Sequence, residues 1–150
     1  MKLARTLSAA LLAGAIALAG CAEQGGGAGD LFDHRVDYIG DNSKVTQLLD
    51  QIGFDDLGKY TIELDTEKVP HGLKLRFDEI KGAVADSTVM TKATEALGLI
   101  KNLDYVEISS GNDTFRLDEN EASEALGYSV KKLGESKDAL EKFISERVSR

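Results

Sequence analysis

Two neighbouring segments with a strict alternation of apolar and polar residues limit the fold of this chain more than any other feature. Residues 60–65 read YTIELD and residues 73–78 read LKLRFD, so every second residue is apolar. A period of two is that of a β-strand with one buried face. The connection contains Pro70 and Gly72, and the two strands are therefore predicted to form a β-hairpin. Ion pairs are expected on its solvent face, between Lys74 and Arg76 on one strand and Glu63 and Asp65 on the other.

A second hairpin is expected later in the chain. Residues 104–109 are rich in aromatic and β-branched side chains, which indicates a third strand. The sequence SGND at residues 110–113 is typical of a turn, and Phe115 and Leu117 mark a fourth strand. Four strands in two hairpins predict an antiparallel sheet.

Four helices are predicted from apolar residues at helical spacing and from their end signals. They extend from Asp41–Ser43 to Gly53, from Asp86 or Ser87 to about Ile100, from Glu119 to Leu126, and onward from Ser136. The element order αββαββαα indicates an α+β fold, in which an antiparallel sheet of about four strands packs against helices. Residues 31–150 are enough for a single domain of this kind.

The first 20 residues are expected to be a lipoprotein signal peptide. Lys2 and Arg5 form a short basic start, and the Ala/Leu-rich run at residues 7–18 is too short to span a bilayer. The run ends in Leu18-Ala19-Gly20-Cys21, which resembles the lipobox of bacterial lipoproteins. The resemblance implies lipidation of Cys21, cleavage before it, and palmitate-type acyl chains that anchor the protein in a lipid bilayer.

Lipidation of Cys21 also restricts the chemistry of the mature domain. It is the single cysteine of the chain, so no thiol is left for a disulfide, a zinc ligand or a nucleophile. Residues 21–30 are Gly-rich and are expected to be a flexible tether. The net charge of −8, more negative still without the leader, excludes nucleic acid as a plausible partner. The lipid is therefore expected to be the membrane contact, on the extracytoplasmic side, and most readily on a Gram-positive plasma membrane.

Three segments of the chain resemble domain-of-unknown-function family 4825, which is found in bacterial lipoproteins. They read YIGDNSKV at residues 38–45, TIEL at 61–64 with Gly72-Leu73 after it, and NLDYVE at 102–107 with Thr114–Arg116 after it. Together they cover most of the expected domain. The resemblance implies a lipoprotein domain, and it implies no reaction, ligand or catalytic residue.

The start of the first long helix is the segment with the most functional character. Tyr38, Gly40, Asp41 and Asn42 place an aromatic ring and two polar side chains where backbone N–H groups point outward. These four residues could bind a small anion or a partner. The structural alternative is a helix-start turn in which Tyr38 or Ile39 packs as a hydrophobic staple.

Catalytic and metal-site patterns are weak. The match to S-x-x-K at residues 129–132 and the match to S-x-N at 110–112 occur in the wrong order for penicillin-binding enzymes, and no K-T-G motif follows. The acidic cluster around His34 follows a flexible tether, and His71 has no ligand at a suitable spacing. Close carboxylates such as Asp55-Asp56 are expected by chance among 26 acidic residues. No catalytic residue, metal site or cofactor is therefore expected.

The sequence favours a membrane-anchored, extracytoplasmic protein without enzymatic activity. Its domain would be an interaction or sensory module with an envelope protein as partner. The alternative is a small-ligand-binding domain, or a minor envelope hydrolase, with a cleft between sheet and helices.

Overall fold

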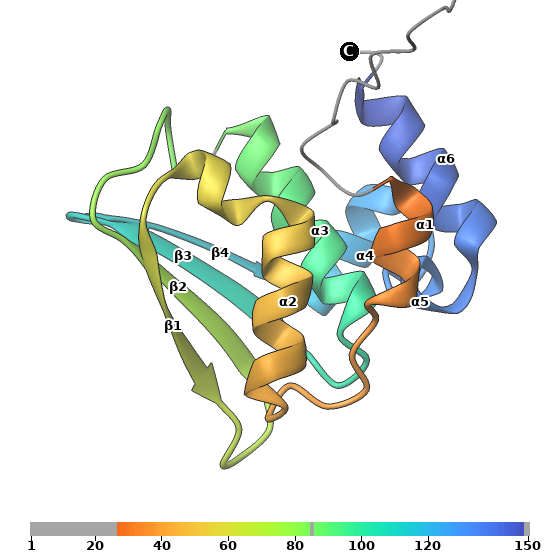
Figure 1. Cartoon of the computed structure of the whole chain (residues 1–150), viewed down its shortest axis with the longest axis horizontal. Coiled ribbons are helices and arrows are strands. Elements are labelled where there is room, and N and C mark those ends of the chain that lie inside the picture. The colour runs from red at the N-terminus through yellow and green to blue at the C-terminus, as the bar shows by residue number, and fades with distance from the viewer. Residues whose placement is uncertain (1–26, 85, 149–150) are drawn as a thin grey trace, which may run out of the picture.

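The computed structural model describes residues 27–84 and 86–148 as a sheet packed against helices (Figure 1). The strands are β1 (Tyr60–Asp65), β2 (Gly72–Phe77), β3 (Tyr105–Ser110) and β4 (Asp113–Asp118). The helices are α1 (Ala28–Asp33), α2 (Asn42–Ile52), the 3-10 helix η1 (Phe54–Leu57), α3 (Ser87–Leu99), α4 (Glu119–Leu126), α5 (Lys132–Glu135) and α6 (Lys137–Val148). The α+β class is thus confirmed, and both predicted hairpins are present.

The sheet is mixed, and the prediction of an antiparallel sheet is wrong at its centre. The strand order is β1-β2-β3-β4, with antiparallel pairs at both edges and a parallel pair between β2 and β3. In register, Leu75 lies opposite Ile62 on one side and Ile108 on the other. The reason is the long connection through α3, which returns the chain to the starting end of β2 so that β3 runs in the same direction.

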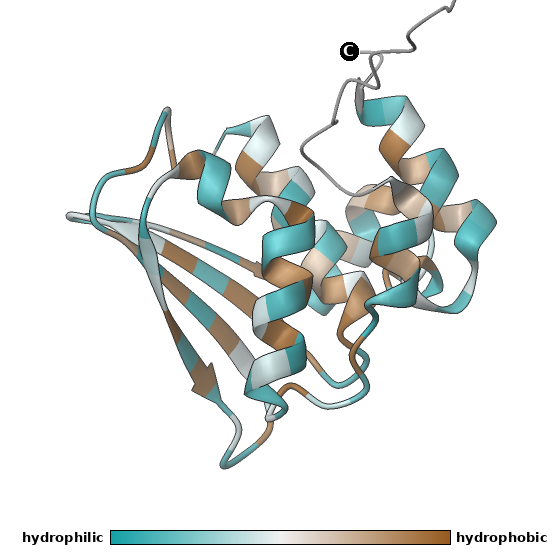
Figure 2. Ribbon diagram, in the orientation of Figure 1, coloured by the Kyte–Doolittle hydropathy of each residue, from teal (hydrophilic) through white to brown (hydrophobic). Residues whose placement is uncertain are grey.

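The two faces of the sheet differ in polarity. Figure 2 shows the alternation of hydrophobic and hydrophilic bands along the strands. One face packs under the helices and carries buried residues such as Leu73, Leu75, Val106 and Ile108. The other face, which we call the open face, carries the charged residues expected from the alternation. Lys74 Nζ lies 3.5 Å from Glu63 and 3.8 Å from Asp65, as predicted. The prediction is wrong for Arg76, which has no ion pair among the described residues because Thr61 lies opposite it.

The predicted helix signals act as expected. Asp41 and Asp86 accept hydrogen bonds from backbone N–H groups at the starts of α2 and α3. Asp118 and Glu121 form a capping box at α4, which ends at Gly127 in the left-handed conformation. The side chain of Ser136 accepts a hydrogen bond at the start of α6, at 3.3 Å from Ala139 N. These local interactions fix where each helix begins.

The short helices α1, η1 and α5 were not predicted. Helix α1 begins at Ala28, so the last residues of the expected tether are helical. It is held by packing, because Leu31 is buried in the core and α1 lies against α6. Periodicity could not indicate such short elements, whose conformation depends on distant neighbours. In the part of the chain that is described, no helix is both long and apolar enough to cross a bilayer.

Candidate functional site

An apolar groove lies between α3, α4 and α6, and we call it the α3–α4–α6 groove. Its volume is about 560 Å³, within the usual range for small-molecule sites. Its apolar walls are formed by Ile52, Met90, Leu117, Ala122, Ala125, Leu126 and Ile144, and its polar lining by Ser87, Thr88, Thr91, Lys92, Thr94, Glu95 and Arg147. Met90 is one of the few large apolar side chains that are exposed among the described residues, at 43%.

Glu95 of α3 is the unusual residue of this groove. It is only 8% exposed, and within residues 27–84 and 86–148 it has neither a hydrogen bond nor an ion pair. No completely buried side-chain oxygen or nitrogen of the described residues lacks a hydrogen-bond partner. The carboxyl oxygens of Glu95 must therefore keep some solvent contact, and Glu95 lines the groove. A buried carboxyl group without a partner is costly, and functional sites are where such groups are tolerated.

The charge of Glu95 depends on two neighbouring cations. Burial raises the pKa of the Glu95 carboxyl to about 7, while Lys92 and Arg147 lower it by a smaller amount. Lys92 Nζ donates a hydrogen bond to the carbonyl oxygen of Ile52 at 2.8 Å. The guanidinium of Arg147 lies 4.3 Å from the centre of the Phe143 ring. Both cations are thus held at the groove by contacts other than Glu95.

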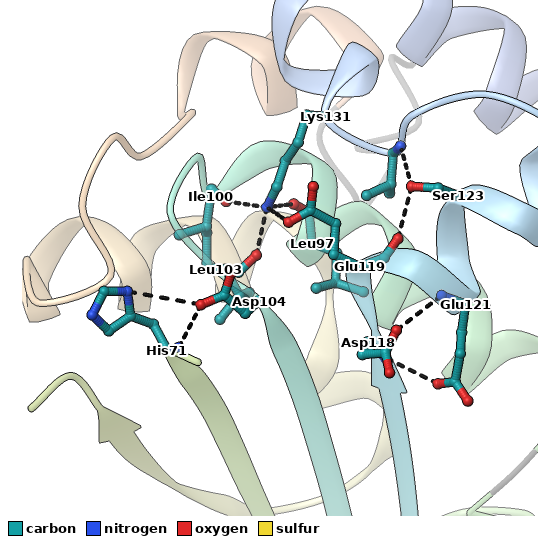
Figure 3. A network of polar contacts seen from close by, with 11 residues as sticks. His71, Leu97, Ile100, Leu103, Asp104, Asp118, Glu119, Glu121, Ser123 and Lys131 are labelled. Carbon is teal, nitrogen blue, oxygen red and sulfur yellow. Dashed lines mark hydrogen bonds and ion pairs between the residues drawn. The ribbon is translucent and has the colours of Figure 1, made fainter. Parts of the chain in front are cut away.

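A second polar cluster, around Lys131, is structural (Figure 3). Lys131 Nζ donates hydrogen bonds to the carbonyl oxygens of Leu97, Ile100 and Leu103, at 2.8, 3.1 and 2.5 Å. Glu119 lies 3.9 Å away. Burial lowers the pKa of the Lys131 ammonium, and nearby carboxylates oppose that shift. The Leu97 carbonyl belongs to the last turn of α3, and those of Ile100 and Leu103 lie just after it, so Lys131 satisfies carbonyl groups at the end of this helix.

The S-x-x-K match has Lys132 as its lysine, not the half-buried Lys131. Ser129 and Lys132, its two defining positions, are both exposed. The S-x-N match begins at Ser110, the last residue of β3, and continues through the turn before β4. The two motifs therefore lie at the surface, and neither lines the α3–α4–α6 groove.

The segment Tyr38–Asn42 forms the start of α2. Tyr38 is 54% exposed, and its ring covers Gly40, where a Cβ atom would overlap it. Ile39 is buried, and its N–H donates to Asn102 Oδ1 at 2.7 Å. Asp41 caps the helix and lies 3.3 Å from Lys44 Nζ. These contacts are those of an ordinary capped helix start. None of the four candidate residues lines the groove. Binding by Tyr38, Gly40, Asp41 and Asn42 stays a prediction.

The residues considered as metal ligands are not gathered into a site. Within the described ranges, no group of three or more His, Cys, Asp or Glu side chains is placed to hold a metal ion. His34 Nδ1 lies 2.7 Å from the carbonyl oxygen of Asp30 in its own helix turn. The backbone N–H of His71 donates a hydrogen bond to the Asp104 carboxylate at 2.6 Å. Cys21 lies outside the described residues.

One comparison with known proteins identifies a family. A family model described as Domain of unknown function (DUF4825) matches residues 31–123. The chain belongs to this family. The matched range contains Lys92 and Glu95 but ends before α6, which supplies Ile144 and Arg147 to the groove. Searches of curated proteins and of solved structures returned no match. The family description assigns no activity.

Sequence reasoning missed Glu95, although a signal was present. In the sequence, Glu95 is the one acidic residue of a mostly apolar run from Ala93 to Ile100, and the structure buries every residue of that run. An ionisable residue within a continuous apolar stretch of a helix is unusual, because it must be paired, neutral or functional. The other walls of the groove come from α4 and α6, which local patterns could not bring together with α3.

Proposed function

We propose that this protein is a lipid-anchored, extracytoplasmic binding module of the cell envelope and that the α3–α4–α6 groove is its binding site. The observation that carries the proposal is the combination of an apolar groove with a buried carboxyl group that has no partner in the described part of the chain. Apolar walls with a few polar groups are typical of ligand sites, because the walls provide affinity and the polar groups provide orientation.

The anchoring part of the proposal rests on the sequence. The basic start, the short apolar run and the lipobox-like Leu18-Ala19-Gly20-Cys21 favour acylation of Cys21. Only residues 22–27 separate Cys21 from α1. A fully extended stretch of that length reaches roughly 20 Å, so an acylated domain would stay close to the bilayer surface. The Gram-positive plasma membrane is the proposed location.

The groove favours binding over hydrolysis. Its lining includes threonine hydroxyls, but Thr91 and Thr94 donate hydrogen bonds at 2.8 Å to carbonyl oxygens of their own helix, those of Ser87 and Met90. A nucleophilic hydroxyl needs a base within hydrogen-bond distance. Among the described residues, Glu95 makes no hydrogen bond to any hydroxyl of the lining, whether of Ser87, Thr88, Thr91 or Thr94. This supports a role for Glu95 as an orienting group for a ligand.

Anchoring is tested by membrane fractionation with metabolic labelling by an acyl-chain analogue. The native protein should carry the label and sediment with membranes, whereas Cys21→Ala should lose the label and appear in the soluble fraction. A labelled Cys21→Ala variant that still sediments would contradict anchoring through this residue.

The groove is tested by affinity capture of the acylated protein from membranes. Ala125→Trp should fill the mouth of the groove, because Ala125 is an exposed residue of its lining. Ala83→Trp is the matched control, since Ala83 is exposed and lies outside the lining. We expect native protein and control to recover the same bound species and Ala125→Trp to lose it. If native protein, Ala83→Trp and Ala125→Trp all recover the bound species equally, binding lies outside the groove. If the native protein recovers no more than the Cys21→Ala variant does, a membrane partner is contradicted.

A further inference from the structure

We infer that the α3–α4–α6 groove binds a small anionic amphiphile, a fatty carboxylate of medium chain length, with the acyl chain along the apolar wall and the head group between Glu95, Lys92 and Arg147. This inference rests on the proposed function, because it names the ligand class of the same groove. It depends on three properties of the groove, namely its apolar wall, its charges and the unpartnered state of Glu95.

The wall suits a linear apolar chain. Met90, Leu126 and Ile144 come from three different helices and line one continuous hollow of about 560 Å³. Unbranched methionine adapts to irregular apolar ligands because it has several rotatable bonds. Burial of each further methylene of a ligand should tighten binding roughly fourfold. Affinity should therefore increase with chain length until the groove is filled.

The charges favour an anion. Lys92 of α3 and Arg147 of α6 are the cations that line the groove, and both act electrostatically on Glu95. The residues lining it from α2, β4 and α4 are uncharged: Ile52, Leu117, Ala122, Ala125 and Leu126. With Glu95 protonated, the lining carries two positive charges on a protein whose net charge is −8. A carboxylate head group is complementary to this arrangement, whereas an amine would face two cations.

The unpartnered carboxyl of Glu95 completes the head-group site. In its neutral form a carboxyl group donates one hydrogen bond, and a ligand carboxylate is a strong acceptor. The ligand would thus supply the partner that Glu95 lacks within the described chain. No proton has to be transferred, since the hydrogen bond is shared between a neutral acid and a carboxylate.

The protonation of Glu95 predicts the pH dependence of binding. The pKa of Glu95 lies at about 7, so the neutral form predominates at pH 6 and the ionised form at pH 8. If only the neutral form accepts the anion, the apparent affinity should fall about tenfold between these pH values. An amphiphilic amine would show the opposite trend, because it would pair with the ionised form.

The test is calorimetric titration of the full chain carrying Cys21→Ser with decanoate, decylamine and decanol, each below its micelle concentration. Decanoate should bind at pH 6 and about tenfold more weakly at pH 8, with decanol and decylamine weaker at pH 6. In Glu95→Gln the side-chain amide still donates a hydrogen bond, so decanoate should bind with little dependence on pH. Glu124→Gln, a matched change at an exposed residue of α4, should behave as the native protein.

The outcomes separate this inference from the proposed function. Equal binding of decanol and decanoate, or tighter binding of decylamine as the pH rises, would overturn the choice of an anion. Absence of binding by all three probes would overturn the amphiphile as ligand class. In either case, loss of a captured species in Ala125→Trp would still support the groove as a binding site. Methyl NMR shifts of Met90 and Ile144 on addition of decanoate would locate the binding in the groove.

Discussion

The open face of the sheet and the α3–α4–α6 groove differ in whether their charged groups have partners within the fold. On the open face, charged side chains face one another, as Arg116 does with Glu107 at 3.8 Å. Tyr105 is covered there by the Arg116 guanidinium at 3.6 Å and donates a hydrogen bond to Asp65 at 3.1 Å. In the groove, Glu95 is buried, and within residues 27–84 and 86–148 its carboxyl group has no hydrogen bond or ion pair.

This difference separates a stabilising surface from a binding surface. Partnered charges already have their interactions within the fold, so they gain little from a ligand. An unpartnered buried carboxyl costs stability in the free protein and can recover that cost when a ligand binds. The comparison predicts opposite signs for substitutions in the two regions, and the following predictions test it from the largest effect to the smallest.

Glu95→Gln should stabilise the protein at high pH. The pKa of Glu95 is raised from 4.5 to about 7 in the folded protein. As pH rises from 4.5 to 7, the unfolded chain ionises this group freely while the folded protein resists ionisation, so the native protein loses stability. Above pH 7 the loss is constant at about 3 kcal/mol. Urea unfolding at pH 4.5 and pH 8 measures it, and the stability gain from Glu95→Gln should appear only at pH 8. An equal gain from Glu124→Gln would mean that burial of Glu95 is not the cause.

Gly72→Val on the open face should destabilise the protein by about 2 kcal/mol, because a Cβ at Gly72 would overlap the Tyr105 ring. The ring would have to leave the position in which Arg116 covers it. Urea unfolding at pH 7 measures the loss. Thr61→Val, at an exposed position of β1, is the control for a valine introduced on this face. A Gly72→Val variant as stable as the native protein would show that Tyr105 packing contributes little to the open face.

Lys131→Met should cost about 1–2 kcal/mol, because it would leave the carbonyl oxygens of Leu97, Ile100 and Leu103 without their shared donor. Lys131 is half-buried, and unlike Glu95 its charged group has hydrogen-bond partners, as the charges of the open face do. Chemical denaturation measures the loss, with Lys132→Met as the matched control at an exposed neighbour. If Lys131→Met were stabilising, burial without a partner would not be what distinguishes Glu95.

Part of the open face could be predicted from the sequence, whereas the groove could not. Alternation in residues 60–65 and 73–78 placed Lys74 opposite Glu63, because facing positions on one hairpin depend only on local register. The same pattern says nothing of strand direction, so the parallel pairing of β2 and β3 was missed. The groove needs α3, α4 and α6 together, and α6 is brought there by tertiary packing. Of that site, the sequence offered only an acidic residue within the apolar end of α3.

Arg116→Met should have the smallest effect, a loss of about 0.5–1 kcal/mol that decreases with added salt. The guanidinium is 48% exposed beside Glu107, so water and ions screen the pair. Methionine keeps apolar cover on the Tyr105 ring but removes the cation over its face. Urea unfolding at low and high salt measures both parts. Arg76→Met is the control, since Arg76 is exposed on the same face and no ion pair to it is found in the described chain. A larger loss of unfolding free energy for Arg116→Met than for Gly72→Val would mean that charge, rather than packing of Tyr105, stabilises the open face. The open face would then differ from the groove in the strength of the ion pairs that it contains.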